Sequence, residues 1–185
     1  MDRADVMRAV AAQAGDSLII ANLGSNAYDL YTHGHRPGNL YMRGAMGLTG
    51  SVGLGLAMAR PDRRVIVVDG DGSLLMNLGQ LATVAAEAPA NLLHIVLVNG
   101  RWQETGGQRI ATAGRADLAA IARGAGIAEV ADVSDLDALS RVLADTQRRP
   151  GPWLVTVRIT EQGAAQAPGT DPMANRDEFM RAAGA

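Results

Sequence analysis

The residues best suited to chemistry in this chain form a glycine-rich acidic turn, Asp69-Gly70-Asp71-Gly72-Ser73. The turn directly follows the apolar run at 65–68, and Asn99 ends a second apolar run, twenty-eight positions after Asp71. A carboxylate, an amide oxygen and a backbone carbonyl from the loop after Asn99 are the hard oxygen ligands that Mg²⁺ prefers. Gly72 and Ser73 open a predicted helix, whose first amides and dipole favour a phosphate. The pattern therefore predicts a site for magnesium and a diphosphate group.

Each of these signals has an ordinary structural explanation. A Gly-Asp-Gly segment is often only a tight turn, and an Asn-Gly pair after a strand is usually the same. Here the two occur at the ends of successive apolar runs, with one predicted helix between them. Their joint occurrence favours a binding site over two unrelated turns.

Apolar runs and helical patterns alternate along the chain and place these turns at one edge of a sheet. We expect strands at 17–22, 64–69, 92–98, 129–131 and 153–160. We expect helices at 5–14, 46–59, 74–87, 118–124, 136–148 and 172–183, and a turn entering a short helix at 24–31. Strands that are apolar throughout are typical of a parallel sheet with helices on both faces. The sequence thus predicts an α/β fold with a doubly wound, mostly parallel sheet, whose ligands bind beyond the carboxyl ends of the strands.

Composition sets the class of protein. The 185 residues are 48% hydrophobic with a formal net charge of −2, enough apolar content for one domain with a sizeable core. We expect that domain at 1–160, followed by a linker and a short terminal helix at 161–185. The charge balance offers no basic surface for nucleic acid or membrane, and residues 1–15 lack the pattern of a signal peptide. We therefore expect a cytoplasmic protein.

Two absences narrow the chemistry further. All 17 basic residues are arginines, so no lysine can form a Schiff base with pyridoxal phosphate or serve a P-loop. No cysteine is present, which excludes a thiol nucleophile and iron–sulfur ligation. Covalent chemistry would have to come from a serine, a carboxylate, a metal or an organic cofactor.

The acidic turn followed by Asn99 resembles the diphosphate-binding motif of thiamine-diphosphate-dependent enzymes. The segment 39–47, Asn-Leu-Tyr-Met-Arg-Gly-Ala-Met-Gly, and the glycine-spaced run at 50–57 are similar to phosphonopyruvate decarboxylases and to the β subunits of sulfopyruvate decarboxylases. The segment 99–108 resembles their Asn-Gly-x-aromatic-x-x-Thr-Gly-x-Gln pattern. The likeness covers about 24–108, and it implies the thiamine diphosphate-binding fold.

The resemblance also implies roles for particular residues. Magnesium would be bound by the side chains of Asp71 and Asn99 and by the backbone carbonyl of Arg101. The cofactor-binding residues would be Gly24, Ser25, Asn26, Gly44, Met46, Gly70, Gly72, Ser73 and Asn99. Among these, Gly44 would offer its carbonyl to the aminopyrimidine, and Met46 would be the apolar wedge that bends the cofactor. An ordinary core methionine is the alternative for Met46.

The activity implied by the resemblance is decarboxylation of a small anionic 2-oxo acid, 3-sulfopyruvate or phosphonopyruvate, to the aldehyde and CO2. In this family the glutamate that activates the cofactor lies on a separate pyrimidine-binding domain, for which this chain has no room. We therefore expect a β-type subunit that works with an α subunit in a hetero-oligomer, with thiamine diphosphate and Mg²⁺ as cofactors. Two alternatives are a carboligase of the acetolactate synthase type, whose extra central domain is absent, and a non-catalytic assembly subunit.

No catalytic residue is assigned to this chain. Where pyruvate decarboxylases carry a catalytic glutamate, the sequence has Thr105, and Glu104 is one residue out of register. Arg36, Arg43 and Arg101 are candidates to contact a sulfonate or phosphonate, because a guanidinium suits such anions. They could equally be surface residues or subunit contacts.

For several other residues the sequence predicts a role less specifically. The four glycines of the helix predicted at 46–59 cost roughly 1 kcal/mol each relative to alanine, so we expect the cofactor or another subunit to pack closely there. These glycines are Gly47, Gly50, Gly53 and Gly55. His33 and His35 could contact substrate or be solvated loop residues, and His94, within a strand, is expected to be structural.

Overall fold

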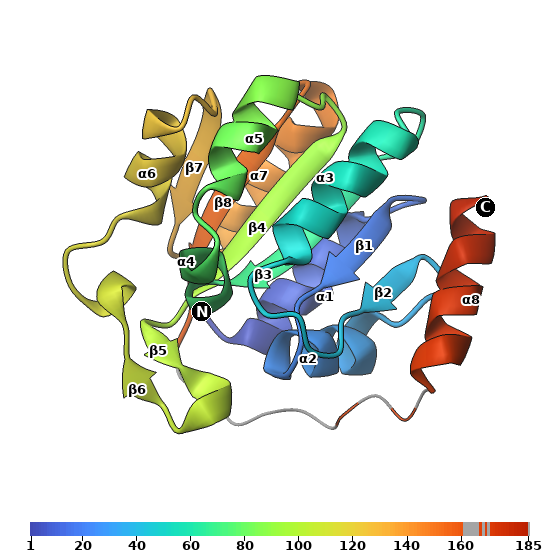
Figure 1. Ribbon diagram of the computed structural model, residues 1–185, viewed down its shortest axis with the longest axis horizontal. Coiled ribbons are helices and arrows are strands. Elements are labelled where there is room, and N and C mark those ends of the chain that lie inside the picture. The colour runs from blue at the N-terminus through green and yellow to red at the C-terminus, as the bar shows by residue number, and fades with distance from the viewer. Residues whose placement is uncertain (161–166, 168, 170, 185) are drawn as a thin grey trace.

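The computed structural model describes residues 1–160, 167, 169 and 171–184. Its centre is a parallel sheet of six strands in the order β2-β1-β3-β4-β8-β7 (Figure 1). The strands are β1 (Leu18–Ala21), β2 (Asn39–Tyr41), β3 (Val65–Gly70), β4 (Leu92–Val98), β7 (Glu129–Val133) and β8 (Trp153–Arg158). The α/β prediction is confirmed.

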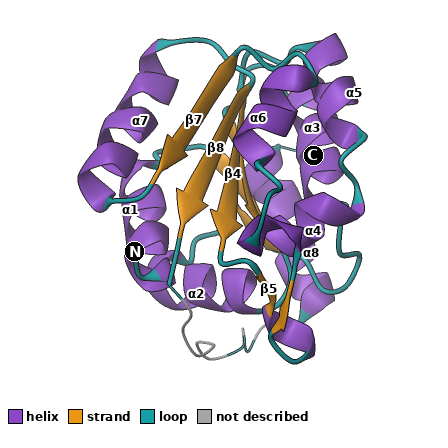
Figure 2. Cartoon of the chain, turned by 90° about the vertical axis from the view of Figure 1, so that its left-hand side faces the viewer, coloured by secondary structure: helices purple, strands orange, loops and turns teal. Residues whose placement is uncertain are grey.

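Helices cover both faces of the sheet, as Figure 2 shows from the side. They are α1 (Arg3–Gln13), α2 (Ser25–Gly34), α3 (Thr49–Ala59), α4 (Asp71–Met76), α5 (Gln80–Glu87), α6 (Leu118–Gly124), α7 (Leu136–Arg148) and α8 (Pro172–Ala183). Buried side chains of α1, α2 and α7 form one core with Ile19 and Ala21, whereas those of α3, α5, α6 and α8 form another with Leu18 and Ile20. Because successive residues of β1 face opposite layers, the strand has to be apolar throughout.

The helix predicted at 74–87 is two helices. Helix α4 already begins at Asp71, and the chain leaves helical geometry at Asn77, whose φ is −146° and ψ 56°. The side-chain amide of Asn77 donates to the carbonyl of Gly47 at 3.1 Å and to Ser51 Oγ at 3.3 Å. Asn77 therefore bonds to the start of α3 instead of continuing its own helix.

The helix predicted at 46–59 begins later, at Thr49. Gly44, Ala45 and Gly47 have φ values of 83°, 56° and 91°, which a right-handed helix cannot accommodate. Strand β2 was also missing from the prediction, because three residues are too few to show a period. The short antiparallel hairpin of β5 (Arg101–Trp102) and β6 (Gln108–Arg109), with the 3-10 turns η1 (Gln103–Thr105) and η2 (Ala111–Ala113), was missing as well.

Two glycines of α3 pack against this chain's own sheet and helix. A Cβ on Gly50 would lie 2.1 Å from Gln80 Oε1, and one on Gly53 would lie 2.1 Å from Val67 Cγ2. For these two residues the expectation of a cofactor or another subunit was wrong, because the neighbours are α5 and β3. A Cβ on Gly55 would meet no described atom within 4 Å.

Helix α8 packs beside the edge strand β2. The Asn175 side chain accepts from the Tyr41 amide at 3.1 Å and donates to the Asn39 carbonyl at 2.9 Å. These bonds pair backbone groups that an edge strand would otherwise expose. The predicted linker at 161–170 lies, apart from residues 167 and 169, outside the described residues. None of the described helices is long and apolar enough to cross a membrane.

The strand order creates a switch point beside β1. From β1 the chain goes outward to β2, returns to β3 on the other side of β1, and continues to β4. The turns that follow β1, β3 and β4 consequently lie together at the carboxyl edge of the sheet (Figure 1). Ligands of open α/β sheets bind at such a point.

Candidate functional site

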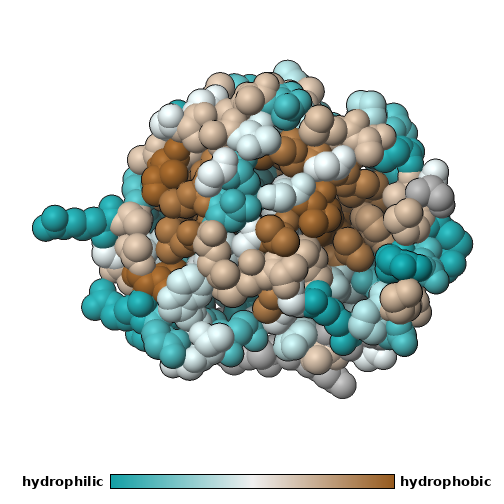
Figure 3. Space-filling model, in the orientation of Figure 1, coloured by the Kyte–Doolittle hydropathy of each residue, from teal (hydrophilic) through white to brown (hydrophobic). Residues whose placement is uncertain are grey.

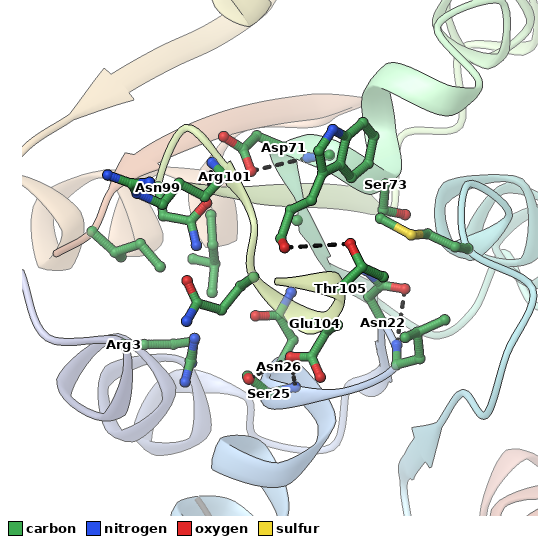
Figure 4. A pocket seen from close by; sticks show the side chains of 18 residues that line it. Arg3, Asn22, Ser25, Asn26, Asp71, Ser73, Asn99, Arg101, Glu104 and Thr105 are labelled. Atoms are coloured by element: carbon green, nitrogen blue, oxygen red, sulfur yellow. Dashed lines mark hydrogen bonds between the residues drawn. The ribbon is translucent and has the colours of Figure 1, made fainter. Parts of the chain in front are cut away.

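The three turns surround a cavity of about 60 Å³, shown in Figure 4. Of the predicted site residues, the cavity is lined by Ser25, Asn26, Met46, Gly70, Asp71, Gly72, Ser73, Asn99 and Arg101. Gly24 and Gly44 line a neighbouring cavity of about 260 Å³ together with Arg43 and Glu104. The structure thus brings the predicted residues to one edge of the sheet. Their roles in binding stay predictions.

Asp71 is the most constrained residue of the site. Its side chain is buried, which raises the pKa of the carboxyl above its usual value, while hydrogen bonds from Thr112, Gly100 and Gly72 oppose that shift. Asp71 Oδ2 accepts from Thr112 Oγ1 at 2.6 Å and from the Gly100 amide at 2.8 Å, and Oδ1 accepts from the Gly72 amide at 2.9 Å. These three bonds leave about one carboxylate lone pair for a cation.

Asn99 and Arg101 shape the loop after β4. Asn99 Oδ1 accepts from the Arg101 amide at 2.9 Å, which leaves one lone pair on that oxygen. Gly100 between them has a φ of 72°, and its amide bonds to Asp71. The Arg101 guanidinium donates to the Gly107 carbonyl at 2.8 Å and so closes the hairpin onto itself.

The glycine turn between β3 and α4 is hydrogen-bonded to the turn that precedes α3. Ser73 Oγ accepts from the Gly47 amide at 3.0 Å. The position of a Cβ on Gly72 is 3.5 Å from Met46 Cε and only 2.6 Å from Trp102 Cζ3. Met46 therefore belongs to the wall of the site, and Trp102 covers the amino end of α4.

The amino end of α2 is occupied by a side chain of the hairpin. The Ser25 amide donates to Glu104 Oε1 at 2.8 Å, and Ser25 Oγ donates to the same oxygen (Figure 4). Gly24 has a φ of 70°, and a Cβ there would lie 2.4 Å from the carboxyl carbon of Glu104. The turn that was predicted to contact a diphosphate thus holds a carboxylate.

One candidate arginine lies away from the site. Arg36 donates to the carbonyls of Gly15 and Ser17, which precede β1, so it sits at the amino edge of the sheet. Its expected place near the site was wrong, because the segment that contains Arg36 leads into the start of β2.

The histidines contact other side chains of the fold. His35 Nδ1 lies 2.8 Å from the Tyr41 hydroxyl, and His33 Nδ1 lies 3.3 Å from Arg8. His94 is buried in β4, 3.5 Å from Asp69, which fits the structural role expected of it. These contacts favour structural roles for His33 and His35 over contact with substrate.

Sequence reasoning missed several residues of the site. Thr112 lies in a stretch without a motif, and nothing in the sequence links it to Asp71. Arg3 lines the cavity from α1, where it forms a buried ion pair with Asp29 on α2. Trp102 could have been predicted, since an aromatic residue at its position belongs to the family pattern at 99–108.

The polar groups suit a metal-bound diphosphate. Asp71 and Asn99 offer acceptors for a cation, whereas the Ser25 amide and hydroxyl and the helix ends offer donors for an anion. The remaining space of about 60 Å³ holds only a few water molecules. The donor set fits such a group, but the room for it is taken by the hairpin.

Comparison with known proteins identifies similar chains. Residues 23–157 match the family described as thiamine pyrophosphate enzyme, C-terminal TPP binding domain. The phosphonopyruvate decarboxylase of Streptomyces viridochromogenes is 46% identical over 144 residues, which are 78% of this chain and 36% of that protein. The sulfopyruvate decarboxylase subunit beta of Methanothermobacter thermautotrophicus is 41% identical over 137 residues, 74% of this chain and 73% of that subunit.

A solved structure resembles the fold. It is that of a putative thiamin diphosphate-dependent enzyme from Mycobacterium smegmatis, with a TM-score of 0.73 and 23% identity, covering 88% of this chain and 32% of that one. The chain spans about a third of the phosphonopyruvate decarboxylases that it matches, at 36% and 35% of their lengths.

Proposed function

Because this chain belongs to the thiamine pyrophosphate (TPP) enzyme family, as its C-terminal TPP-binding domain, we propose that it is the β-type subunit of a non-oxidative 2-oxo acid decarboxylase. The proposed substrate is 3-sulfopyruvate or phosphonopyruvate, and the products are the aldehyde and CO2. The observation that carries the proposal is the likeness to a sulfopyruvate decarboxylase β subunit over most of both chains. We propose 1–160 as the diphosphate-type domain, 161–185 as linker and terminal helix, and the cytoplasm as its location.

TPP, with Mg²⁺ at its diphosphate, is the cofactor that the residues present would hold. Asp71 and Asn99 would bind the metal ion through side-chain oxygens and Arg101 through its carbonyl. The turns after β1 and β3 would bind the diphosphate through amides and hydroxyls, with Gly24, Ser25, Asn26, Gly70, Gly72 and Ser73 as the residues concerned. Two helix ends, those of α2 and α4, would then face the same anion, which their dipoles favour.

The turn before α3 serves the other end of the cofactor in this proposal. Gly44 and Gly47 hold positive φ values that direct the backbone of the turn, and Met46 lies against the glycine turn of α4. Gly44 would offer its carbonyl to the aminopyrimidine and Met46 its side chain as an apolar wedge. When bound, the cofactor supplies an electron sink for the carbon–carboxylate bond that breaks. This chain contributes the positioning, and its apolar wall of Met46, Leu97 and Trp102 excludes water.

We propose that an α subunit carries the pyrimidine-binding domain and its activating glutamate. Relatives named as subunit beta support a partner. The chain also exposes an apolar face suited to one, visible as the brown area across the middle of Figure 3. Helix α3 has no charged residue, and Leu48 just before it continues an outer stripe of Val52, Gly55, Met58 and Ala59.

This face adjoins the site. Met58 is 52% exposed on α3, and Met76 is 58% exposed at the end of α4. The Asn77 side chain joins the end of α4 to the Gly47 carbonyl, in the turn that carries Met46. Contiguous apolar surface of this kind marks interaction sites. We place the α subunit there because a partner on this face reaches the cofactor site.

The acidic tail of the substrate would be recognised by arginine. Arg43 lines the cavity beside Gly44, and Arg101 lines the one beside Asp71. A guanidinium can bind a sulfonate or phosphonate through paired hydrogen bonds. These two arginines are therefore the proposed specificity residues.

Co-expression of this chain with the α-type chain of its genomic neighbourhood tests the function. The purified pair, with TPP and Mg²⁺, should release CO2 and aldehyde from sulfopyruvate or phosphonopyruvate, and the Asp71→Asn pair should not. Decarboxylation by this chain alone would contradict the need for a partner. Acetolactate formation from pyruvate would identify a carboligase instead, and a pair that binds TPP without turning over any 2-oxo acid would identify an assembly subunit.

A further inference from the structure

The hairpin segment at 101–110 fills the site with an anion of its own. Its Glu104 carboxylate accepts from both the amide and the hydroxyl of Ser25, the first residue of α2. The first amides of a helix lack partners within the helix and attract negative charge. A phosphate oxygen could accept the same two hydrogen bonds from Ser25 that the Glu104 oxygen accepts.

The fit between Glu104 and the turn is close. Gly24 leaves no room for a Cβ, because its position would be 2.4 to 2.7 Å from the three atoms of the Glu104 carboxyl group. Ser25 and Glu104 are 79 positions apart in the sequence, so it is the tertiary fold that brings them into contact. Glu104 therefore takes the position of an anionic ligand at the amino end of α2.

The same segment covers the second phosphate-binding turn. The indole of Trp102 lies over Gly72, where a Cβ would come within 2.6 Å of the ring. Together, Trp102 and Glu104 occupy the amino ends of α4 and α2, and the space left between them is about 60 Å³. Both side chains therefore stand where we propose that the diphosphate binds.

The hairpin segment is held together by bonds of its own and is bounded by glycines. Within it, the Arg101 guanidinium donates to the Gly107 carbonyl and the Gly107 amide donates to the Trp102 carbonyl, at 2.8 and 3.0 Å. Glycines with positive φ stand at its base and tip: Gly100 at 72°, Gly106 at 120° and Gly107 at 72°. Residues of this type absorb the backbone change of a hinge.

From these contacts we propose that the hairpin segment is a self-closing lid, and that Glu104 competes with the cofactor's diphosphate for the amino end of α2. This inference rests on the proposed function and adds a regulatory step to it. The cofactor site is open only in the fraction of molecules whose lid has released Ser25. The apparent affinity for a diphosphate is lowered by that fraction.

Binding of magnesium pyrophosphate to this chain, measured by titration calorimetry, tests the competition. Glu104→Ala should bind at least about threefold more tightly than the unmodified chain, because the open fraction rises. Glu87→Ala, which removes an exposed glutamate from α5, is the matched control and should leave the affinity unchanged. An affinity of Glu104→Ala that is equal to or weaker than that of the unmodified chain, or absence of binding by both, overturns the proposal.

A measurement without ligand tests the lid itself. In a Trp153→Phe background, Trp102 is the one tryptophan of the chain. Glu104→Ala should increase acrylamide quenching of Trp102 fluorescence and speed tryptic cleavage after Arg101 and Arg109. Glu104→Gln keeps an acceptor without the charge, so its quenching and cleavage rate should lie between those of Glu104→Ala and of the Trp153→Phe chain. If quenching and the cleavage rate are unchanged in Glu104→Ala, the lid proposal is wrong.

The two proposals can fail separately. If Glu104→Ala tightens pyrophosphate binding but the complex with the α subunit turns over no 2-oxo acid, the function is wrong and the lid stands. If the complex decarboxylates its substrate and Glu104→Ala binds pyrophosphate no better, the lid is wrong and the function stands.

Discussion

Thr112 Oγ1 donates a hydrogen bond of 2.6 Å to Asp71 Oδ2, across 41 positions of the chain. With the Gly100 amide at 2.8 Å on the same oxygen, it turns one side of the carboxylate toward the protein. The other oxygen, Oδ1, accepts only from the Gly72 amide and keeps a lone pair that these bonds do not use. The segment after the hairpin thereby orients the residue that we propose as a metal ligand.

Thr112→Val removes this hydrogen bond at nearly constant volume. We expect the unfolding free energy to fall by about 1 kcal/mol, and the Mg²⁺ concentration needed for TPP binding to rise several-fold, because Asp71 is less firmly oriented. Urea unfolding and calorimetry at varied Mg²⁺ measure the two effects. Thr32→Val, at an exposed position of α2, is the control; an unchanged Mg²⁺ requirement in Thr112→Val would show that Thr112 does not orient the ligand.

Asp71→Asn separates the metal site from the fold. Burial raises the pKa of the Asp71 carboxyl, which means that the buried charge is unfavourable without a cation. The variant removes this charge, but its amide NH2 has to face one of the donors that now bond to the carboxylate, a loss of about 1–3 kcal/mol that offsets the gain. Stability without metal should therefore change little, while Mg²⁺-dependent TPP binding falls by about a hundredfold or more. Chemical unfolding without Mg²⁺ and calorimetry with it give both values. Unaltered binding would remove Asp71 from the metal site.

The sequence allowed the sheet to be predicted because its central strands are buried on both faces and mostly apolar, as in β3 and β4. It also pointed to Asp71 and Asn99, since both directly follow such strands. It could not show that the Asn77 side chain bonds to the turn before α3 and to α3 itself, where the helix predicted at 74–87 is interrupted. Nor could it show that Arg36 lies at the amino edge of the sheet, opposite the site. Thr112 and Glu104 reach the site through tertiary folding alone, and no local pattern records that.

Tyr41 should make stability depend on pH in the alkaline range. Burial raises the pKa of its hydroxyl to about 12, against an unfolded value near 10. Below pH ~10 both states are neutral; as pH rises from 10 to 12 the unfolded state ionises first, so up to about 3 kcal/mol of stability is lost. Urea unfolding between pH 8 and 11 follows the loss. Tyr41→Phe should flatten this slope, and an equally steep slope in that variant would assign the loss to other groups.

Met58→Glu should disrupt the proposed interface with the α subunit. A charge at the carboxyl end of the apolar stripe of α3 has to be desolvated on association, whereas in the free chain it remains in water. Met173→Glu is a matched control on α8, because the two methionines are 52% and 57% exposed. Co-purification with the α subunit should be lost for Met58→Glu and kept for Met173→Glu, with similar melting temperatures. Retention of the partner by Met58→Glu would place the interface on another face.

Arg43→Ala should weaken the preference for substrates with an anionic tail. A charged hydrogen bond contributes about 1.5–3 kcal/mol, so kcat/KM for sulfopyruvate or phosphonopyruvate should fall about tenfold or more, while kcat/KM for pyruvate stays nearly constant. Arg36→Ala is the control, because Arg36 bonds to the Gly15 and Ser17 carbonyls at the amino edge of the sheet. It should lower stability without changing the ratio between substrates. An equal loss on all substrates in Arg43→Ala would assign this arginine to the turn around Gly44 rather than to the substrate, because only a group that contacts the tail can distinguish substrates by it.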